Sequence, residues 1–200
     1  MPMNSDIRLL NAAKKMDKDA IVKIFDLYAS PLYKYALRLC GDPLLADHIV
    51  GDVFARLVDQ LASGQGPRSN LRSYLYQSTY HRIVDEARYS QRRTPLEVLV
   101  SHGQEAGSVH PRLDDPILLD TLLKAIEHNL TDDQRHVIIL RFVEEFSLRE
   151  TAAILGKATN HVKVIQSRAL AKLRQVFVRG EARSAISLPR IDDLSNSLRT

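Results

Sequence analysis

The sequence contains a single cysteine, no tryptophan and no long apolar run. One cysteine, Cys40, excludes an internal disulfide and a zinc site built from cysteines. A membrane-spanning helix needs roughly 20 apolar residues, and no stretch approaches that length. The polar segment from Met1 to Lys18 is unlike a secretory signal. These absences predict a cytoplasmic protein that makes no contact with a membrane.

Residue patterns that carry catalysis or metal binding are also missing. There is no glycine-rich phosphate loop of the Walker or dinucleotide type. Asp47, Asp52 and Asp59 are spread along a predicted helix and do not converge on one point. The histidines lack the close spacing of metal ligands; they are His48, His81, His102, His110, His128, His136 and His161. The sequence therefore predicts no active site, no metal and no cofactor.

Apolar residues recur at helical spacing along most of the chain, and no alternating strand pattern occurs. The predicted fold class is all-α, with two small helical domains joined by a flexible linker. The predicted boundaries are a first domain over 1–92, a linker over 93–114, a second domain over 115–178 and a tail over 179–200. Prolines and glycines interrupt any periodicity in the linker, so the two domains are expected to move independently.

Proline-containing pairs divide the first domain into helices. Ser30-Pro31 predicts a helix start, and Asp42-Pro43 predicts the next one in the same way. After a glycine-containing loop, a further helix is predicted over 71–91.

The stretch from Thr131 to Arg174 has the pattern of a helix-turn-helix. Ser147 and Glu150 form a capping box, in which each side chain binds the backbone N–H of the other residue. Gly156 supplies the left-handed residue that ends this short helix. Thr159 is the predicted N-cap of a longer helix that runs to about residue 177.

This longer helix is predicted to enter a DNA major groove. Its buried stripe consists of Val162, Ile165, Ala169 and Leu173. The side chains predicted to contact duplex DNA are Thr159, Asn160, His161, Lys163, Val164, Ser167 and Arg168. Lysines and arginines occur without any acid from 157 to 179. The positive electrostatic field of such a segment attracts the phosphate backbone of DNA.

The predicted helix over 71–91 interleaves tyrosines with cations. Aromatic rings stack on unpaired bases while arginines follow the phosphates, so this composition favours single-strand binding. Tyr74 is expected to fill the core instead. The residues predicted to contact a single strand are Arg72, Tyr76, Tyr80, His81 and Arg82.

These segments together resemble the sigma factors of bacterial RNA polymerase, in the extracytoplasmic-function (ECF) group of the sigma-70 family. Leu130 to Gly156 looks like the family's fourth region, which reads the −35 promoter element. Leu45 to Leu57 is similar to the helix of the second region that binds core polymerase. Leu71 to Asp85 looks like the segment that opens and captures the −10 element. The resemblance covers about residues 20 to 178.

The resemblance implies a non-catalytic subunit that directs core RNA polymerase to promoters and assists promoter opening. Its implied partners are core RNA polymerase and promoter DNA, and the resemblance leaves an anti-sigma factor open as a further partner. The implied polymerase-binding residues are Asp47, His48, Asp52 and Arg56. The loop from Gly64 to Asn70 becomes the candidate pocket for a flipped-out base.

Two alternatives remain open at this point. One is a helix-turn-helix regulator that binds duplex DNA without polymerase, although such a protein has no use for the aromatic and arginine-containing helix. The other is a helical interaction module, which would not require an acid-free recognition helix.

Overall fold

The computed structural model describes residues 3–92 and 116–181, and every regular element in those ranges is a helix. The N-terminal group comprises α1 (Met3–Ala13), α2 (Lys18–Cys40), α3 (Pro43–Ala62) and α4 (Leu71–Arg92). The C-terminal group comprises α5 (Pro116–Asn129), α6 (Asp132–Ile138), the π-helix η1 (Ile139–Val143), α7 (Leu148–Leu155) and α8 (Thr159–Glu181). The all-α prediction is confirmed. The predicted linker over 93–114 lies outside the described residues, as do residues 182–200 of the predicted tail.

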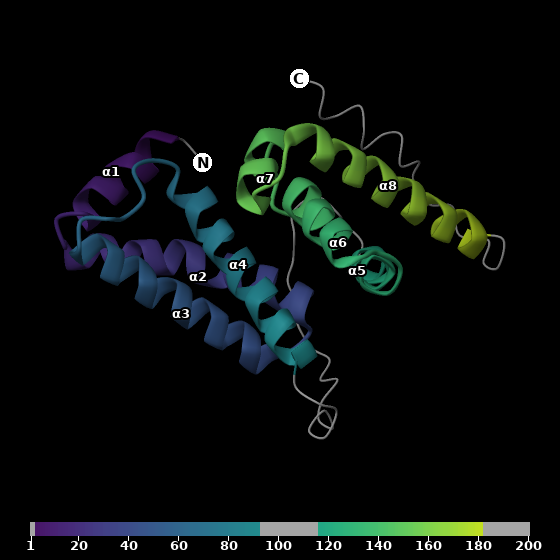
Figure 1. Cartoon of the computed structure of the whole chain (residues 1–200), viewed down its shortest axis with the longest axis horizontal. Coiled ribbons are helices and arrows are strands. Elements are labelled where there is room, and N and C mark those ends of the chain that lie inside the picture. The colour runs from purple at the N-terminus through teal and green to yellow at the C-terminus, as the bar shows by residue number, and fades with distance from the viewer. Residues whose placement is uncertain (1–2, 93–115, 182–200) are drawn as a thin grey trace.

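The N-terminal domain is a bundle in which α2 packs against both α3 and α4 (Figure 1). Its core is formed by apolar side chains at helical spacing, as the periodicity predicts; they include Ile24, Leu32, Ile49, Val53, Leu57, Leu71 and Leu75. The unpredicted helix α1 lies against α2, where Leu10 is buried and the hydroxyl of Tyr28 donates to Asp6 Oδ2 at 2.8 Å.

The start of α3 follows the predicted pattern. The Asp42 carboxylate accepts from the N–H groups of Leu44 at 2.8 Å and Leu45 at 3.2 Å. Pro43 occupies the first turn, where its missing N–H would have had no helical partner. Gly41 ends the preceding helix with a left-handed φ of 70°.

The predicted helix start at Ser30-Pro31 is wrong, because α2 continues through Pro31 without a break. A proline inside a helix removes one backbone hydrogen bond. Tyr28 and Leu32 on either side of it are both buried. Their packing holds the two halves of α2 on the bundle, and burial of this kind outweighs a local preference.

The C-terminal domain contains a second departure from prediction. The capping-box pattern from Thr131 to Gln134 predicts one helix that runs to about Glu144, but α6 ends at Ile138 and the chain continues as η1. The Glu144 N–H donates to the Ile139 carbonyl at 2.9 Å, which is the wider spacing of a π-helix. The widened turn ends at Glu144, a buried acidic side chain.

The two domains lie against each other, with α4 next to α7 (Figure 1). One cluster of buried residues extends from the N-terminal bundle into the C-terminal domain. It joins Leu75 and Tyr76 of α4 to Leu140 and Phe146 of the second domain. This arrangement differs from the expected independence of the domains, because side chains of both are buried in one continuous contact.

Candidate nucleic-acid and polymerase interfaces

The first helix of the helix-turn-helix, α7, has the predicted cap at its start and the predicted glycine at its end. The Ser147 hydroxyl accepts from the Glu150 N–H at 3.2 Å, and the Ser147 N–H donates to Glu150 Oε2 at 2.8 Å. Burial raises the pKa of Glu150, but hydrogen bonds with Ser147 and Asn70 outweigh it and hold the pKa below its usual value. Gly156 ends α7 with a φ of 62°, and α8 begins at Thr159.

Replacing Ser147 with alanine is expected to lower the free energy of unfolding by about 1 kcal/mol, because the first turn of α7 loses its cap. Chemical denaturation would measure the change. Ser69→Ala, in the exposed loop before α4, is the matched control and should change stability little. Equal effects of the two substitutions would contradict a capping role for Ser147.

The second helix of the motif, α8, buries one face and exposes the other. Its buried side chains are Val162, Ile165, Ala169 and Leu173, as predicted. All seven residues predicted to contact duplex DNA are exposed: Thr159, Asn160, His161, Lys163, Val164, Ser167 and Arg168. Gln166 lies at the margin, where its Oε1 accepts from Arg141 Nε at 3.1 Å. The opposite face is therefore available to a duplex.

Charged side chains line the outer face of α3. Asp47, His48 and Arg56 are exposed. Asp52 is partly buried, and its Oδ2 lies 2.7 Å from Arg82 Nη2 on α4 and 3.8 Å from His48 Nε2. The four residues predicted to bind polymerase thus come from one helix, and one of them also ties α3 to α4.

Two side chains predicted to hold a single strand are instead engaged by the C-terminal domain. Tyr76 is only 1% exposed, and its hydroxyl donates to Glu144 Oε2. Arg72 donates to the Glu144 carbonyl oxygen and lies 4.0 Å from the centre of the Phe146 ring. In this arrangement Tyr76 is inaccessible to DNA, whereas the engaged Arg72 keeps 37% of its side chain exposed. Tyr74, expected in the core, is half-buried and packs against it.

The remaining members of that set differ in accessibility. His81 is exposed, and Tyr80 is half-buried with its ring 4.8 Å from that of His136. Arg82 donates to Glu86 Oε1 at 3.1 Å in addition to its ion pair with Asp52. The structure therefore does not bring the five predicted residues together on one open surface.

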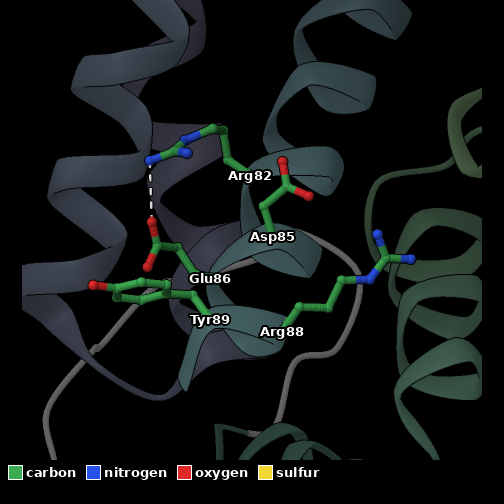
Figure 2. Close-up of a pocket in the computed structure, with 5 residues that line it drawn as sticks. All are labelled: Arg82, Asp85, Glu86, Arg88 and Tyr89. Atoms are coloured by element: carbon green, nitrogen blue, oxygen red, sulfur yellow. Dashed lines mark hydrogen bonds and ion pairs between the residues drawn. The ribbon is translucent and has the colours of Figure 1, made fainter. Parts of the chain in front are cut away.

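A pocket of about 430 Å³ lies at the C-terminal end of α4. It is lined by Arg82, Asp85, Glu86, Arg88 and Tyr89. Arg88 extends toward the helices of the C-terminal domain, whereas Glu86 and Tyr89 turn the other way (Figure 2). Arg88 and Tyr89 thus add a cation and an aromatic ring to the residues of α4 that are predicted to contact a single strand.

Sequence reasoning missed two buried polar residues of the C-terminal domain, Glu144 and His136. Glu144 is 7% exposed and lies 3.5 Å from Arg38 Nη1 and 3.9 Å from Arg72 Nη2. His136 is 4% exposed, and its Nδ1 lies 2.9 Å from the Tyr35 hydroxyl. Glu144 lies within the largely apolar segment from Val137 to Phe146, and His136 directly precedes it. A polar residue in such a segment indicates a buried hydrogen-bonding partner.

Burial determines the protonation of these groups. It raises the pKa of Tyr76 above its usual range, with the nearby Glu144 carboxylate adding to the shift. Tyr76 therefore stays a hydrogen-bond donor. Burial lowers the pKa of His136 from 6.5 to about 4, against the opposing influence of Asp132 and Asp133. At neutral pH His136 is uncharged.

Among the helices of the described residues, none combines the length and apolarity that a membrane span requires. In the same part of the chain, histidine, cysteine and acidic side chains do not gather into a metal-binding group.

Two family models match the chain. Residues 24–93 match "Sigma-70 region 2", which covers most of α2, α3 and α4. Residues 128–175 match "Sigma-70, region 4", which covers α6 to most of α8. Together the two matches cover more than half of the chain.

Several curated relatives are similar along most of the chain. The ECF RNA polymerase sigma factor SigX of Bacillus subtilis is 28% identical over 163 residues, which are 76% of this chain and 80% of SigX. SigW of the same organism is 26% identical, over 83% of this chain and 93% of SigW. BldN of Streptomyces coelicolor is 24% identical over 86% of this chain, which spans 65% of BldN.

Solved structures share the fold. The sigma factor RpoE of Bartonella quintana, in complex with the anti-sigma factor NepR, superimposes with a TM-score of 0.61 at 25% identity, over 78% of this chain and 94% of that one. CnrH in complex with the cytosolic domain of CnrY gives a TM-score of 0.65 at 20% identity, over 87% of this chain and 97% of that one.

A helix-turn-helix with an exposed basic helix, joined to a bundle with an aromatic and arginine-containing helix, defines a DNA-binding protein of transcription. The matches to both regions identify the family within this class: the chain belongs to the sigma-70 family of RNA polymerase sigma factors, in its ECF group. Its function is to direct core RNA polymerase to promoters.

Proposed function

We propose that the three surfaces described above divide the work of promoter recognition. In this proposal α8 reads duplex DNA at the −35 element, α3 binds core polymerase, and α4 with the Gly64 to Asn70 loop holds the displaced strand of the −10 element. The observation that carries the proposal is the two-sided character of α8. Its apolar side chains are buried in the helix-turn-helix, and all of its predicted DNA contacts are exposed.

Within α8 we assign different tasks to charged and polar side chains. Lys163 and Arg168 are exposed cations on a helix with no acid before Glu181, so they suit phosphate contacts. Asn160, His161 and Ser167 are exposed polar groups near the N-terminal end of α8, which is the end a recognition helix inserts into the groove. These three suit contacts with base edges.

Lys163→Ala and Arg168→Ala are expected to weaken binding of the holoenzyme to all promoter sequences alike. Each should reduce the slope of log affinity against log salt by about 1, because one phosphate contact is lost. Asn160→Ala and His161→Ala should instead change which upstream sequence is preferred. Binding titrations with a library of upstream sequences at several salt concentrations would measure both effects. Uniform weakening by all four substitutions would contradict base readout by α8.

On α3 we propose that Asp47, His48, Asp52 and Arg56 contact core polymerase. Three of them are exposed, and the mixed signs of their charges suit a partner surface that carries both signs. Asp52 also pairs with Arg82 at 2.7 Å. Through this ion pair α3 orients a side chain of the proposed single-strand surface.

The proposed strand contacts on α4 are Tyr80, His81 and Arg82, joined by Arg72 and Tyr76 when the C-terminal domain does not cover them. Stacking of a base on a ring contributes roughly 1–3 kcal/mol. Arg68, Ser69 and Asn70 of the adjoining loop are exposed, so that loop is accessible to a base turned out of the duplex.

We further propose an anti-sigma factor as a partner, and the cytoplasm, where core polymerase acts, as the place of action. The structural similarity to RpoE bound to an anti-sigma factor supports the partner. We propose that the chain has no catalytic activity of its own. Affinity purification from the source cells, followed by identification of the bound chains, would test for both core polymerase and an inhibitor.

The decisive experiment compares the protein alone with the protein plus core polymerase. Alone, it should bind promoter duplex weakly, because its N-terminal domain prefers unpaired DNA and separating the strands costs several kcal/mol. With core polymerase it should support specific initiation and protect the melted strand. A protein that bound duplex operators tightly by itself and left polymerase unaffected would be a helix-turn-helix regulator instead.

A further inference from the structure

The side of α8 that points most directly away from its domain carries short, uncharged side chains. Successive residues of a helix turn by about 100°, so side chains three or four positions apart lie along one line. The buried stripe from Val162 to Leu173 fixes the inward direction. The first half of the opposite line consists of Asn160, Val164, Ser167 and Ala171, and all four are exposed. A helix that meets a major groove along this line brings short side chains to the base edges.

Cations flank this outward line on both sides. Lys163 lies about 100° to one side of Val164, and Arg168 lies about 40° to the other. Both cations are exposed. The sugar-phosphate backbones border the major groove, whereas the base edges form its floor. The two cations therefore suit the phosphates on either side, and the outward line suits the bases between them.

Val164 brings a large apolar side chain to the middle of the outward line. It is 45% exposed, and the other exposed large apolar side chain on the described part of α8 is Val178. Valine in a helix has one strongly preferred χ1 rotamer, so its methyl groups are held in place before DNA binds. These methyl groups can neither donate nor accept a hydrogen bond. The base edge that suits Val164 must therefore be apolar as well.

Thymine is the base that offers an apolar group in the major groove. It carries a methyl group at C5, whereas cytosine and adenine present amino groups and guanine presents acceptors. Contact between Val164 and a thymine methyl group would remove both apolar groups from water, which is favourable. An amino group in the same place would lose its hydrogen bonds to water without a replacement. Val164 thus favours thymine and disfavours the bases with polar groups at that place.

We propose that Val164 recognises the 5-methyl group of one thymine in the upstream promoter element. The proposal rests on the function proposed for α8 and names a base feature that this helix reads. Asn160 and Ser167 lie about one turn to either side of Val164, so they contact the neighbouring base pairs through hydrogen bonds. One position of the preferred sequence is then determined by an apolar contact and its neighbours by polar contacts.

Deoxyuridine tests the proposal, because it differs from thymidine only in lacking the 5-methyl group. Starting from the upstream sequence that the holoenzyme prefers, each thymine of either strand is replaced in turn by deoxyuridine, and the affinity of the holoenzyme is measured. One of these replacements should weaken binding about fourfold, which corresponds to the burial of one methyl group. With Val164→Ala in the holoenzyme, the same replacement should have no measurable effect.

Val178→Ala is the matched control. It removes the same two methyl groups from an exposed valine of α8, about 21 Å further along the helix. This variant should retain the fourfold loss. Alanine favours a helix more than valine does, so both substitutions should leave α8 intact, which circular dichroism would verify.

A second measurement returns a methyl group to the DNA. Cytosine at the sensitive position should weaken binding, and 5-methylcytosine should recover part of that loss because its methyl group occupies the same place in the groove. The recovery should be absent with Val164→Ala. A recovery of equal size in both proteins would contradict the proposal.

Other results would overturn the proposal while leaving the function of α8 intact. These are a preferred upstream sequence without thymine, or one in which no deoxyuridine replacement changes the affinity. A fourfold loss that persists with Val164→Ala would assign the methyl contact to a different residue. A holoenzyme without any preference among upstream sequences would instead contradict promoter reading by α8, and the proposed function itself would be wrong.

Discussion

Reversing two exposed charges on α3, with Asp47→Lys and Arg56→Glu together, is expected to weaken binding to core polymerase about a hundredfold. Like charges brought together at an interface cost several kcal/mol, and each reversal creates such a pair if α3 is the docking helix. The double substitution leaves the net charge of the chain unchanged. Any loss of affinity would therefore come from the position of the charges. Initiation in a reconstituted transcription assay should fall in proportion.

Both residues are exposed, so the helical fold should survive and circular dichroism should show an unchanged unfolding transition. A matched control reverses Lys15 and Asp19, which are exposed near the turn between α1 and α2. This control should bind polymerase normally. Equal binding by both double variants would exclude α3 as the polymerase-binding helix, and α8 could still retain its affinity for DNA.

Lowering the pH from 7.5 to 5 is expected to increase the affinity of the free protein for an unpaired oligonucleotide roughly thirtyfold. His136 has a pKa of about 4 when the C-terminal domain is packed against α4, which we call the closed arrangement. Its ordinary pKa, when it meets water, is 6.5. The closed arrangement is therefore fully favoured above pH 6.5 and loses that preference as the pH falls toward 4. At pH 5 the free energy of the closed arrangement, relative to the open one, is about 2 kcal/mol less favourable than above pH 6.5.

The prediction depends on the surroundings of His136. The rings of Tyr35 and Tyr80 lie against it from α2 and α4, so protonation would place a charge between the domains. Asp132 and Asp133 favour the charged form, but burial outweighs them, and Arg135 and Lys157 act in the same direction as burial.

His136→Phe is the control for other effects of pH. The phenylalanine keeps a ring at the interface and cannot take up a proton. Oligonucleotide affinity should be measured at both pH values for both proteins, and only the unsubstituted protein should show the thirtyfold component. A variant with the same pH dependence as the unsubstituted protein would contradict the role given to His136.

Helix ends that depend on neighbouring residues were predicted well from the sequence. The capping box of Ser147 and Glu150, the left-handed Gly156 and the Asp42 cap all occur as expected. Each is a contact between groups a few residues apart in the chain, so the side chains present determine the geometry. The buried stripe of α8 followed from its period for the same reason.

Elements that depend on distant contacts were predicted less well. Pro31 carries a local signal for a helix start, yet α2 continues because Tyr28 and Leu32 are buried on either side of it. The π-helix η1 has no local signal that the hydrophobic period reveals. Glu144 at its end is stable in the interior only because Arg38 and Arg72 of the other domain balance its charge.

The sequence by itself determined the class of the protein, its all-helical character and the exposed face of α8 that is predicted to meet DNA, because these follow from periodicity and from contacts within a few residues. Only the tertiary structure decided the state of α4. Tyr76 and Arg72 have the composition of a single-strand surface, but whether a ring is exposed depends on what packs on it. That partner, Glu144 with Phe146, lies about 70 residues further along the chain and becomes a neighbour only when the domains close.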